Sequence, residues 1–369
     1  MNIEKGRKIL FLIGGLRAGG AEKVCIGLVN ELFKQGYDVS LLVLNLNKQE
    51  LKEYLNKNVP LYNLNINHVR TAFFPLKKTL SELKPDICLS FNFQLSIQLI
   101  LLKKIYRLDY KIFSRGINTF SKKLEYESSV RHKYLNAFLI KRLYKKSDFF
   151  IAQSTGMKKD MMDSLGIDEH KIKIIFNPCF LLQEKQNEEI LKDIKNKKDI
   201  LFVGNLKEQK NVLFLLDCIK ELSVQRKDFI FNIVGDGKLK TTLKNKSKYL
   251  QIDDYVVFQG FSSAPSDFYK KADVFVLSSW YEGFPNVLIE ALSYGVPVVS
   301  VDCMSGPSDI VENDINGYLV KDYNVSDFTN KLSKALDKKW DIKKIKETTK
   351  KFAFENIYNQ YKEYLLNEK

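Results

Sequence analysis

Two glutamates, Glu282 and Glu290, frame a turn in the segment SSWYEGFPNVLIEAL (278–292), which directly follows an apolar run. Pro285 suits the first turn of a helix, because proline lacks the N–H that would be unsatisfied there. The free amides at such a helix start, together with the helix dipole, can bind a diphosphate. Glu290 would lie about two helical turns further on, so the two carboxylates can accept hydrogen bonds from different parts of one ligand. The alternative is that Glu290 caps or pairs on a surface helix.

Lys210 follows a second strand-like run and a glycine, in the segment FVGNLKEQKN (202–211). Taken alone, it is one of 59 Lys and Arg residues, and a solvated loop lysine is the simpler interpretation. A fixed cation at this place would stabilise the charge that builds on a departing phosphate, without a metal ion. This chemistry makes Lys210 a candidate catalytic residue.

Both segments resemble motifs of the retaining glycosyltransferases of group 4, and the resemblance covers nearly the whole chain. That family has the GT-B architecture, so the expected fold class is α/β, with two Rossmann-like doubly wound domains facing a central cleft. The resemblance implies that Glu290 holds the ribose hydroxyls of a nucleotide sugar and that Glu282 meets the donor sugar. It also implies that the amides of Gly283 to Asn286 meet sugar and diphosphate, with Lys210 and Glu282 as the catalytic residues.

Further glycine-containing segments extend the resemblance. GGLRAGGAE (14–22), IVGDGKL (233–239) and VFQGF (257–261) match family segments close to the nucleotide or the diphosphate, although glycines after strands are equally common in plain turns. Ser305-Gly306-Pro307 and NGYLV (316–320) also match, with a mainly structural function as the alternative. The expected donor-binding residues are Gly19, Gly20, Gly204, Asn205, Lys210, Gly260, Phe261, Glu282, Gly283, Phe284, Pro285, Asn286, Val287 and Glu290.

Two positions depart from the family pattern. Asn205 stands where the family usually has Arg, so one expected cation is missing and Lys210 becomes more critical. Where many members carry a histidine, this chain has SRGIN (114–118), which resembles a variant in bacterial surface-polysaccharide enzymes. No neutral base is available there, but in a same-face mechanism the leaving phosphate oxygen can accept the acceptor's proton. Arg115 is expected to bind donor or acceptor phosphate, with a structural salt bridge as the alternative.

Metal and redox cofactors are not expected. The sequence has no D-x-D pair, and its three histidines lie far from other candidate ligands. The glycine-rich segment 14–22 is not G-x-G-x-x-G, which argues against a dinucleotide site. The five cysteines are odd in number and scattered, which indicates free, mostly buried thiols in a reducing cytosol. The expected small-molecule partner is a nucleotide sugar, with UDP as the expected nucleotide.

Apolar runs alternate with helical patterns twice along the chain, as in parallel sheets covered by helices. The predicted domains are 1–180 on the acceptor side, 181–350 for the nucleotide sugar, and a C-terminal helix, 351–369, that returns to the first domain. Predicted strands span 8–14, 38–44, 86–90, 110–114, 149–152, 172–176, 200–203, 229–234, 255–258, 274–277 and 298–301, and predicted helices include 21–35, 212–223 and 342–366.

The formal charge of +15 lies almost entirely in residues 1–180, where 30 basic residues face 16 acidic ones. Such asymmetry points to a polyanionic partner. The segment 130–147, VRHKYLNAFLIKRLYKKS, predicts a basic amphipathic helix that could lie on an anionic inner-membrane surface, with an ordinary core-facing helix as the alternative. The longest apolar runs are far shorter than the ~18 residues of a membrane span. We therefore expect a cytoplasmic protein that associates peripherally with the membrane.

The predicted function is transfer of a sugar from a nucleoside diphosphate to a glycan or a polyprenyl-diphosphate-linked acceptor, with retention of configuration, in surface-polysaccharide synthesis. Two alternatives come from other classes. A nucleic-acid-binding protein would explain the charge, but the sequence has no RNP-like strand, zinc spacing or recognition helix, so no nucleic-acid partner is expected. A catalytically silent GT-B scaffold is left open by the departure at Asn205.

Overall fold

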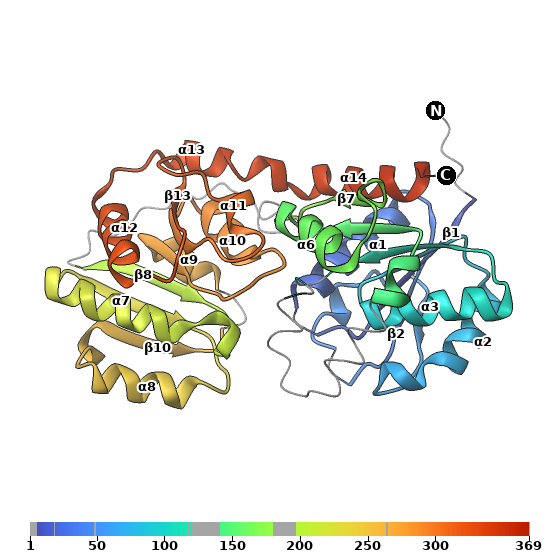
Figure 1. The fold of residues 1–369 in the computed structure, drawn as a ribbon, viewed down its shortest axis with the longest axis horizontal. Helices are drawn as coiled ribbons and strands as arrows, with labels where there is room; N and C mark the ends of the chain where they lie inside the picture. The colour runs from blue at the N-terminus through green and yellow to red at the C-terminus, as the bar shows by residue number, and fades with distance from the viewer. Residues whose placement is uncertain are drawn as a thin grey trace. The chain divides into compact units, whose positions relative to one another are not determined.

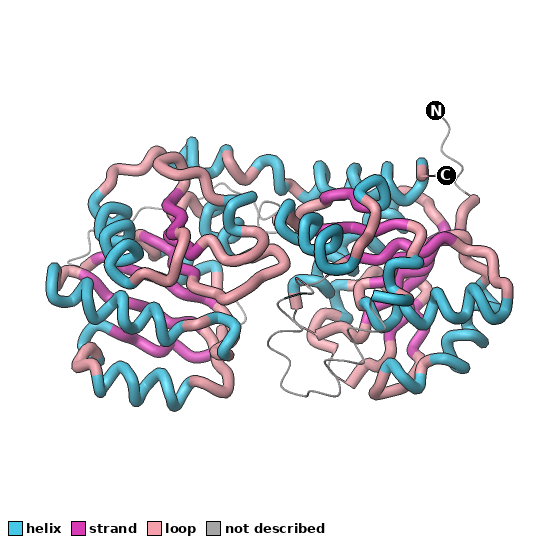
Figure 2. The backbone as a smooth tube through the Cα atoms, viewed as in Figure 1, coloured by secondary structure: helices cyan, strands magenta, loops and turns pink. Residues whose placement is uncertain are grey.

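The computed structural model describes residues 6–368 except 18, 48, 117–118, 120, 122–140, 180–196 and 263–264. The chain divides into two compact units, which are described separately (Figure 1). Unit 1 comprises Met1–Pro178 and Glu355–Lys369, and unit 2 comprises Cys179–Phe354. Each unit contains one parallel sheet with helices packed against it (Figure 2).

Unit 1 contains a seven-stranded parallel sheet with the order β3-β2-β1-β4-β5-β6-β7. Its strands are β1 (Lys8–Ile13), β2 (Asp38–Val43), β3 (Leu61–Asn63), β4 (Ile87–Ser90), β5 (Lys111–Arg115), β6 (Phe149–Ala152) and β7 (Ile172–Ile174). Leu10 of β1 pairs with Ser40 on one side and Cys88 on the other. The strand order reverses between β1 and β4, and in open α/β sheets ligands bind at the carboxyl ends of the strands beside such a reversal.

Among the described residues of unit 1, the helices that connect these strands are α1 (Gly20–Lys34), α2 (Phe73–Leu83), α3 (Phe93–Tyr106) and α6 (Thr155–Leu165). Side chains cap two of them, because Asn92 accepts a hydrogen bond from Gln94 N and Ser154 accepts one from Met157 N. Short 3-10 turns occur at Lys52–Tyr54, Val69–Thr71, Tyr144–Lys146 and Glu169–Lys171. The segment predicted as a basic amphipathic helix, 130–147, lies mostly outside the described residues.

The C-terminal helix, α14 (Phe354–Asn367), packs on unit 1. Its Tyr364 ring contacts Phe113 and Phe149 at centroid distances of 5.4 and 5.8 Å. The prediction of one continuous helix over 342–366 is wrong. The chain forms α13 (Ile342–Glu347), a 3-10 turn (Lys350–Phe352) and then α14. The hydroxyls of Thr348 and Thr349 donate to carbonyls three residues earlier, and such bonds compete with helix continuation.

Unit 2 contains a six-stranded parallel sheet with the order β10-β9-β8-β11-β12-β13. Its strands are β8 (Lys198–Val203), β9 (Phe229–Val234), β10 (Val256–Gly260), β11 (Val274–Leu277), β12 (Val298–Val301) and β13 (Gly317–Val320). The helices are α7 (Val212–Gln225), α8 (Lys240–Tyr249), α9 (Ser266–Lys271), α10 (Asn286–Ser293), α11 (Pro307–Ile310) and α12 (Val325–Asp337), with 3-10 turns at Glu208–Lys210 and Asp253–Tyr255. Here too the order reverses, between β8 and β11, so the loops after these two strands meet at the carboxyl edge of the sheet.

Candidate functional site

Lys210 and Glu282 form an ion pair at the carboxyl edge of the unit 2 sheet. Lys210 Nζ donates to Glu282 Oε1 at 2.6 Å, and the side chains are only 15% and 9% exposed. Ser279 Oγ donates to the same oxygen at 2.6 Å. Within the described part of the chain, Glu282 Oε2 accepts no hydrogen bond, so one oxygen of the carboxylate is left for another donor.

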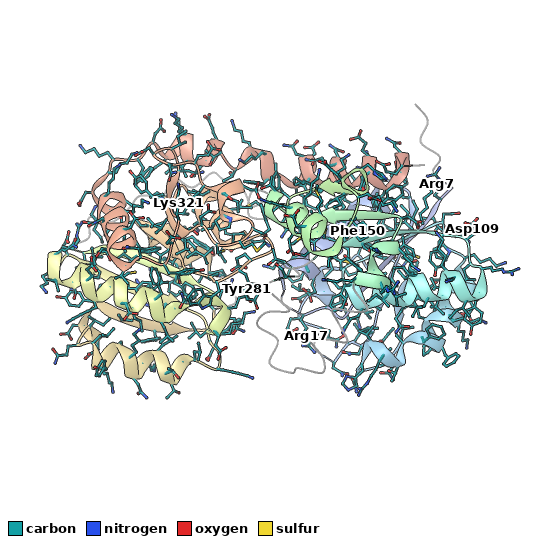
Figure 3. All side chains as sticks on the ribbon, viewed as in Figure 1. Arg7, Arg17, Asp109, Phe150, Tyr281 and Lys321 are labelled. Carbon is teal, nitrogen blue, oxygen red and sulfur yellow. The ribbon has the colours of Figure 1, made fainter. Side chains whose placement is uncertain are left out.

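Hydrogen bonds to backbone carbonyls hold together the two loops that carry Lys210 and Glu282. Ser278 Oγ donates to the carbonyl oxygens of Lys210 and Asn211 at 3.1 and 3.0 Å. Trp280 N donates to Gln209 O at 2.8 Å, and Gln209 Nε2 donates back to the carbonyl of Tyr281, also at 2.8 Å (Figure 3 labels Tyr281). These bonds join residues about seventy positions apart in sequence. The position of Lys210 therefore follows from the turn at 278–282 and not from its own loop alone.

The turn before α10 is built from buried backbone. Pro285 is the N-cap residue, with φ −79° and ψ 87°, so the prediction that it lies in the first helical turn is wrong by one residue. Ser305 Oγ donates to the carbonyls of Glu282 and Gly283, at 3.0 and 2.9 Å. Gly306 has φ +104°, and a Cβ there would overlap Pro285 Cδ. These contacts give Ser305 and Gly306 a structural function, because they bind and pack against the backbone of the turn at 282–285.

Phe284 contributes to the core of unit 2 rather than to a ligand surface. Its side chain is 7% exposed, and its ring lies 5.6 Å from that of Phe352. Gly283 and Pro285 are buried as well, while Asn286 and Val287 are partly exposed at the start of α10. The ligand-binding capacity of this turn accordingly resides in backbone groups and in the first residues of the helix.

Glu290 on α10 is held by a tyrosine that the sequence did not single out. Tyr269 OH donates to Glu290 Oε2 at 2.9 Å, and Tyr269 is fully buried and stacked on Tyr294 at 5.7 Å. Burial, and then the Glu290 carboxylate, raise the pKa of Tyr269 well above its usual value, so the phenol remains a hydrogen-bond donor. Tyr269 lies on α9, 21 residues upstream, and no spacing rule connects it with Glu290.

Three glycines bring the loops after β8, β9 and β10 into contact. Gly204 N donates to Val234 O at 3.0 Å, and Gly235 N donates to Gly260 O at 2.7 Å. A Cβ on Gly235 would overlap Gly204 O, so no larger residue fits there. Phe261 follows this crossing and is 73% exposed, and Asn205 is exposed on the neighbouring loop. The unit 2 residues predicted to bind the donor thus lie at one edge of the sheet, in the loops after its strands, or on α10.

Gly19 and Gly20 open α1 at the carboxyl end of β1 in unit 1. A Cβ on Gly19 would overlap the Glu22 carboxylate, so glycine at this position makes room for a side chain of its own helix. Burial raises the pKa of Glu22, while its own backbone N–H and the charge of Arg115 act in the opposite direction. Arg17 lies at the same edge, opposite to Arg7 and Asp109 (Figure 3).

Arg115, at the end of β5, lies in the interior of unit 1 with 1% exposure. Its Nε donates to Tyr361 OH at 2.9 Å and an Nη donates to Asn177 Oδ1 at 2.6 Å. The guanidinium lies 4.8 Å from the centre of the Phe91 ring. Its other Nη has no partner among the described residues. Arg115 therefore binds two neutral groups, one of them on α14, and the alternative of a structural salt bridge is not what holds it.

The described residues contain no cluster of three or more His, Cys, Asp or Glu side chains suited to a metal ion. The five cysteines are free and buried, as predicted, and burial raises the thiol pKa of Cys25, Cys88, Cys218 and Cys303. Among the described helices, none combines the length and the apolar character that a membrane crossing requires.

Comparison with known sequences gives the family. The model for "Glycosyl transferases group 1" matches residues 183–352, and the model for "Glycosyltransferase Family 4" matches residues 18–179. An uncharacterized glycosyltransferase of Haemophilus influenzae is 30% identical over 339 residues, which are 88% of this chain and 89% of that protein. The chain therefore belongs to the glycosyltransferases of groups 1 and 4, and the family inferred from its motifs is confirmed.

Other relatives carry more specific names. A Campylobacter jejuni N-acetylgalactosamine-N,N'-diacetylbacillosaminyl-diphospho-undecaprenol 4-alpha-N-acetylgalactosaminyltransferase is 29% identical, over 95% of this chain and 96% of its own length. The lipopolysaccharide 1,6-galactosyltransferase of Escherichia coli is 28% identical over 74% of each chain.

Solved structures share the fold. The lipopolysaccharide outer core galactosyltransferase WaaB matches with a TM-score of 0.79 and 24% identity, over 98% of this chain and 99% of that chain. Anabaena HepE, solved in complex with UDP and glucose, matches with a TM-score of 0.76 and 17% identity, over 97% and 99%. The predicted fold class, GT-B with two Rossmann-like domains, is confirmed.

Proposed function

We propose that this glycosyltransferase transfers a sugar from a UDP-sugar to a glycan or polyprenyl-diphosphate-linked acceptor, with retention of configuration, in surface-polysaccharide synthesis. The observation that carries the proposal is the partly buried Lys210–Glu282 pair beside the turn that starts α10. The named relatives support the pathway class, because two of them act on lipopolysaccharide or on a diphospho-undecaprenol acceptor. HepE, a structural neighbour, was solved with UDP and glucose.

The donor would be held by four groups of unit 2. The amides at the start of α10 and the Lys210 ammonium would bind the diphosphate, because both are preorganised positive ends in a partly buried site. Glu290, oriented by Tyr269, would accept hydrogen bonds from the ribose hydroxyls. The unoccupied oxygen of Glu282 would accept one from the donor sugar.

As the bond to the sugar breaks, negative charge would build on the diphosphate, and Lys210 and the helix start would stabilise it. The departing phosphate oxygen would take the proton of the acceptor hydroxyl, so the proposal assigns no protein base. It also needs no metal ion, because Lys210 supplies the positive charge. Gly19 and Gly20 of unit 1 would contact phosphate or acceptor, whereas Arg115 would act on the position of α14.

A lipid-linked acceptor would have to be met at an anionic membrane surface, which agrees with the excess of basic residues in 1–180. The proposal therefore includes peripheral association with the inner face of the cytoplasmic membrane.

The test is a screen of nucleotide sugars for release of the nucleoside diphosphate, combined with calorimetric binding of UDP, GDP, ADP and CMP. Release of UDP from at least one UDP-sugar, and a preference for UDP in binding, are the expected results. Binding of a nucleotide without turnover on any donor or acceptor would favour the catalytically silent GT-B scaffold. Absence of both binding and release would overturn the proposal.

A further inference from the structure

Three exposed apolar side chains lie on the neighbouring helices α2 and α3 of unit 1. Phe74 is 72% exposed, Ile105 59% and Tyr106 40%. The ring of the intervening Phe73 packs on the core and contacts both Phe74 and Tyr106, at centroid distances of 5.5 and 6.3 Å. The two helices run beside each other in Figure 1. We call this group, Phe74, Ile105 and Tyr106 with the basic residues around it, the α2/α3 patch.

The surroundings of these side chains are strongly basic. Residues 69–84 and 103–109 contain seven Lys or Arg residues against two acidic ones, Glu82 and Asp109. Lys77 Nζ lies 5.3 Å from the centre of the Tyr106 ring. Lys103 is paired with Asp148, but in the part of the chain that the structure describes Arg70, Lys78, Lys104 and Arg107 have no ion-pair partner and are exposed. The patch therefore combines protruding apolar groups with uncompensated positive charge.

We propose that the α2/α3 patch is a docking surface for an anionic lipid bilayer, with Phe74 and Ile105 inserted among the acyl chains and the basic residues at the headgroups. Aromatic and aliphatic side chains ringed by Lys and Arg suit the interface of such a bilayer, where apolar burial and attraction to anionic lipid add together. Unit 2 also has exposed large apolar residues, among them Val224 on α7 and Tyr249 on α8. Docking to the bilayer is argued from exposure and charge, and it rests on the proposed function only for its purpose, which is to bring the enzyme to a lipid-linked acceptor.

The test is co-sedimentation of the full chain with vesicles of phosphatidylcholine, with and without phosphatidylglycerol. The variant Phe74→Ser/Ile105→Ser should bind anionic vesicles at least about tenfold more weakly, because two buried apolar side chains are lost. Lys78→Glu/Arg107→Glu should lower binding by about fivefold or more for each charge reversed, and added salt should reduce the difference. The matched control is Val224→Ser/Tyr249→Ser, which removes apolar side chains of unit 2 that are more exposed than Phe74 and Ile105, and it should bind like the unaltered protein.

The proposal would be overturned if anionic vesicles did not retain the unaltered protein, or if they retained all three variants equally. It would also be overturned if the variants lost vesicle binding together with a change in oligomeric state, because the patch would then bind a second copy of the chain. UDP binding is measured in parallel, because unit 2 holds the donor site. A patch variant that loses vesicle binding but keeps UDP binding shows that the substitutions affect the docking surface and not the donor site. If the unaltered protein does not bind UDP at all, this result counts against the proposed function alone.

A separate observation concerns Lys207, which lies in the same turn as Lys210. Lys207 N donates to Asn205 O at 2.9 Å, and Lys207 O accepts from Lys210 N at 3.0 Å. Lys207 is exposed, and among the described residues no carboxylate forms an ion pair with it. Partial loss of solvent and the charge of Lys210 lower the pKa of Lys207, while Glu282 acts in the opposite direction. Lys207 is therefore an exposed cation without an ion-pair partner in the turn that also carries Lys210.

The geometry points to Lys207 as a second cation for the diphosphate of the donor. This inference rests on the proposed function. Lys207→Ala should weaken UDP binding about tenfold, UMP binding less and uridine binding not at all, while Lys207→Arg should retain UDP affinity. Lys248→Ala, an exposed lysine on α8, is the matched control. The inference would be overturned if Lys207→Ala weakened the binding of UDP and of uridine equally. It would also be overturned if Lys207→Ala bound UDP normally while Lys210→Ala bound it weakly, and either result would leave the proposed function intact.

Discussion

Lys210 and Arg115 are both basic residues at the carboxyl edge of a parallel sheet, one in each unit, and their surroundings differ. Lys210 faces a carboxylate and remains partly exposed, in the same unit as the turn that starts α10. Arg115 is buried, faces a hydroxyl and an amide, and ties β5 to α14 and to Asn177 in the loop that follows β7. Exposure and partners therefore decide whether a basic residue at the edge of a sheet is a candidate for binding a ligand.

Lys210→Ala gives the largest expected effect on the unit 2 side of this comparison. Turnover should fall at least ~100-fold, because one preorganised charge that stabilises the departing phosphate is lost. Steady-state kinetics with the best donor measure it, and Lys248→Ala serves as the control. Removal of Lys210 also leaves Glu282 unpaired, so the free energy of unfolding is measured alongside. Near-normal turnover would remove Lys210 from the proposed site.

Glu290→Ala should also reduce turnover at least ~100-fold, because the carboxylate that would orient the ribose is lost. Calorimetry separates the cause: binding of UDP should weaken, whereas the binding of inorganic diphosphate should not. If Glu290→Ala retains the UDP affinity and the rate of the unaltered protein, Glu290 is a surface-helix residue as in the alternative interpretation.

Arg115→Met tests the other side of the comparison. The substitution removes the guanidinium hydrogen bonds to Asn177 Oδ1 and to the Tyr361 hydroxyl, and the loss of a partner by a buried polar group costs about 1–3 kcal/mol. The free energy of unfolding should therefore fall by roughly 2–4 kcal/mol, measured by urea denaturation, while UDP affinity stays unchanged. A variant with normal stability but greatly reduced turnover would contradict the structural function and make Arg115 a phosphate ligand.

Tyr269→Phe should have a smaller effect, because it removes only the hydroxyl that positions Glu290. We expect a loss of about tenfold in UDP affinity, corresponding to roughly 1.4 kcal/mol for one hydrogen bond to a charged group. The double variant Tyr269→Phe/Glu290→Ala should be no weaker than Glu290→Ala, since the hydroxyl acts through the carboxylate. Additive losses would show that Tyr269 acts independently of Glu290.

Chelation should have the smallest effect of all. If Lys210 supplies the charge that a metal would otherwise supply, EDTA leaves turnover largely intact. Strict dependence on added Mg²⁺ or Mn²⁺ would contradict a lysine-based site and place the missing positive charge on a metal.

The strands of both sheets were predictable to within a few residues because parallel strands buried on both faces are nearly continuous apolar runs. β1 and β9 illustrate this, since KILFLI and FIFNIV contain almost only apolar residues. Two strands were not predicted: β3, whose three residues are all at least partly exposed and give no such signal, and β13, a short run of four residues that starts with glycine. The interruption between α13 and α14 was missed for a different reason, because amphipathic spacing continues across Thr348 and Thr349.

The sequence by itself determined the family and the spacing of Glu282, Pro285 and Glu290, because these residues lie within one strand-turn-helix unit whose local geometry follows from residue order. Tertiary structure alone decided which side chains meet them. The pairing of Lys210 with Glu282 spans 72 residues, the support of Glu290 by Tyr269 spans 21, and the contact of Arg115 with Tyr361 spans 246. Such contacts depend on how strands are ordered in a sheet and on where a terminal helix packs, and no local pattern encodes that order.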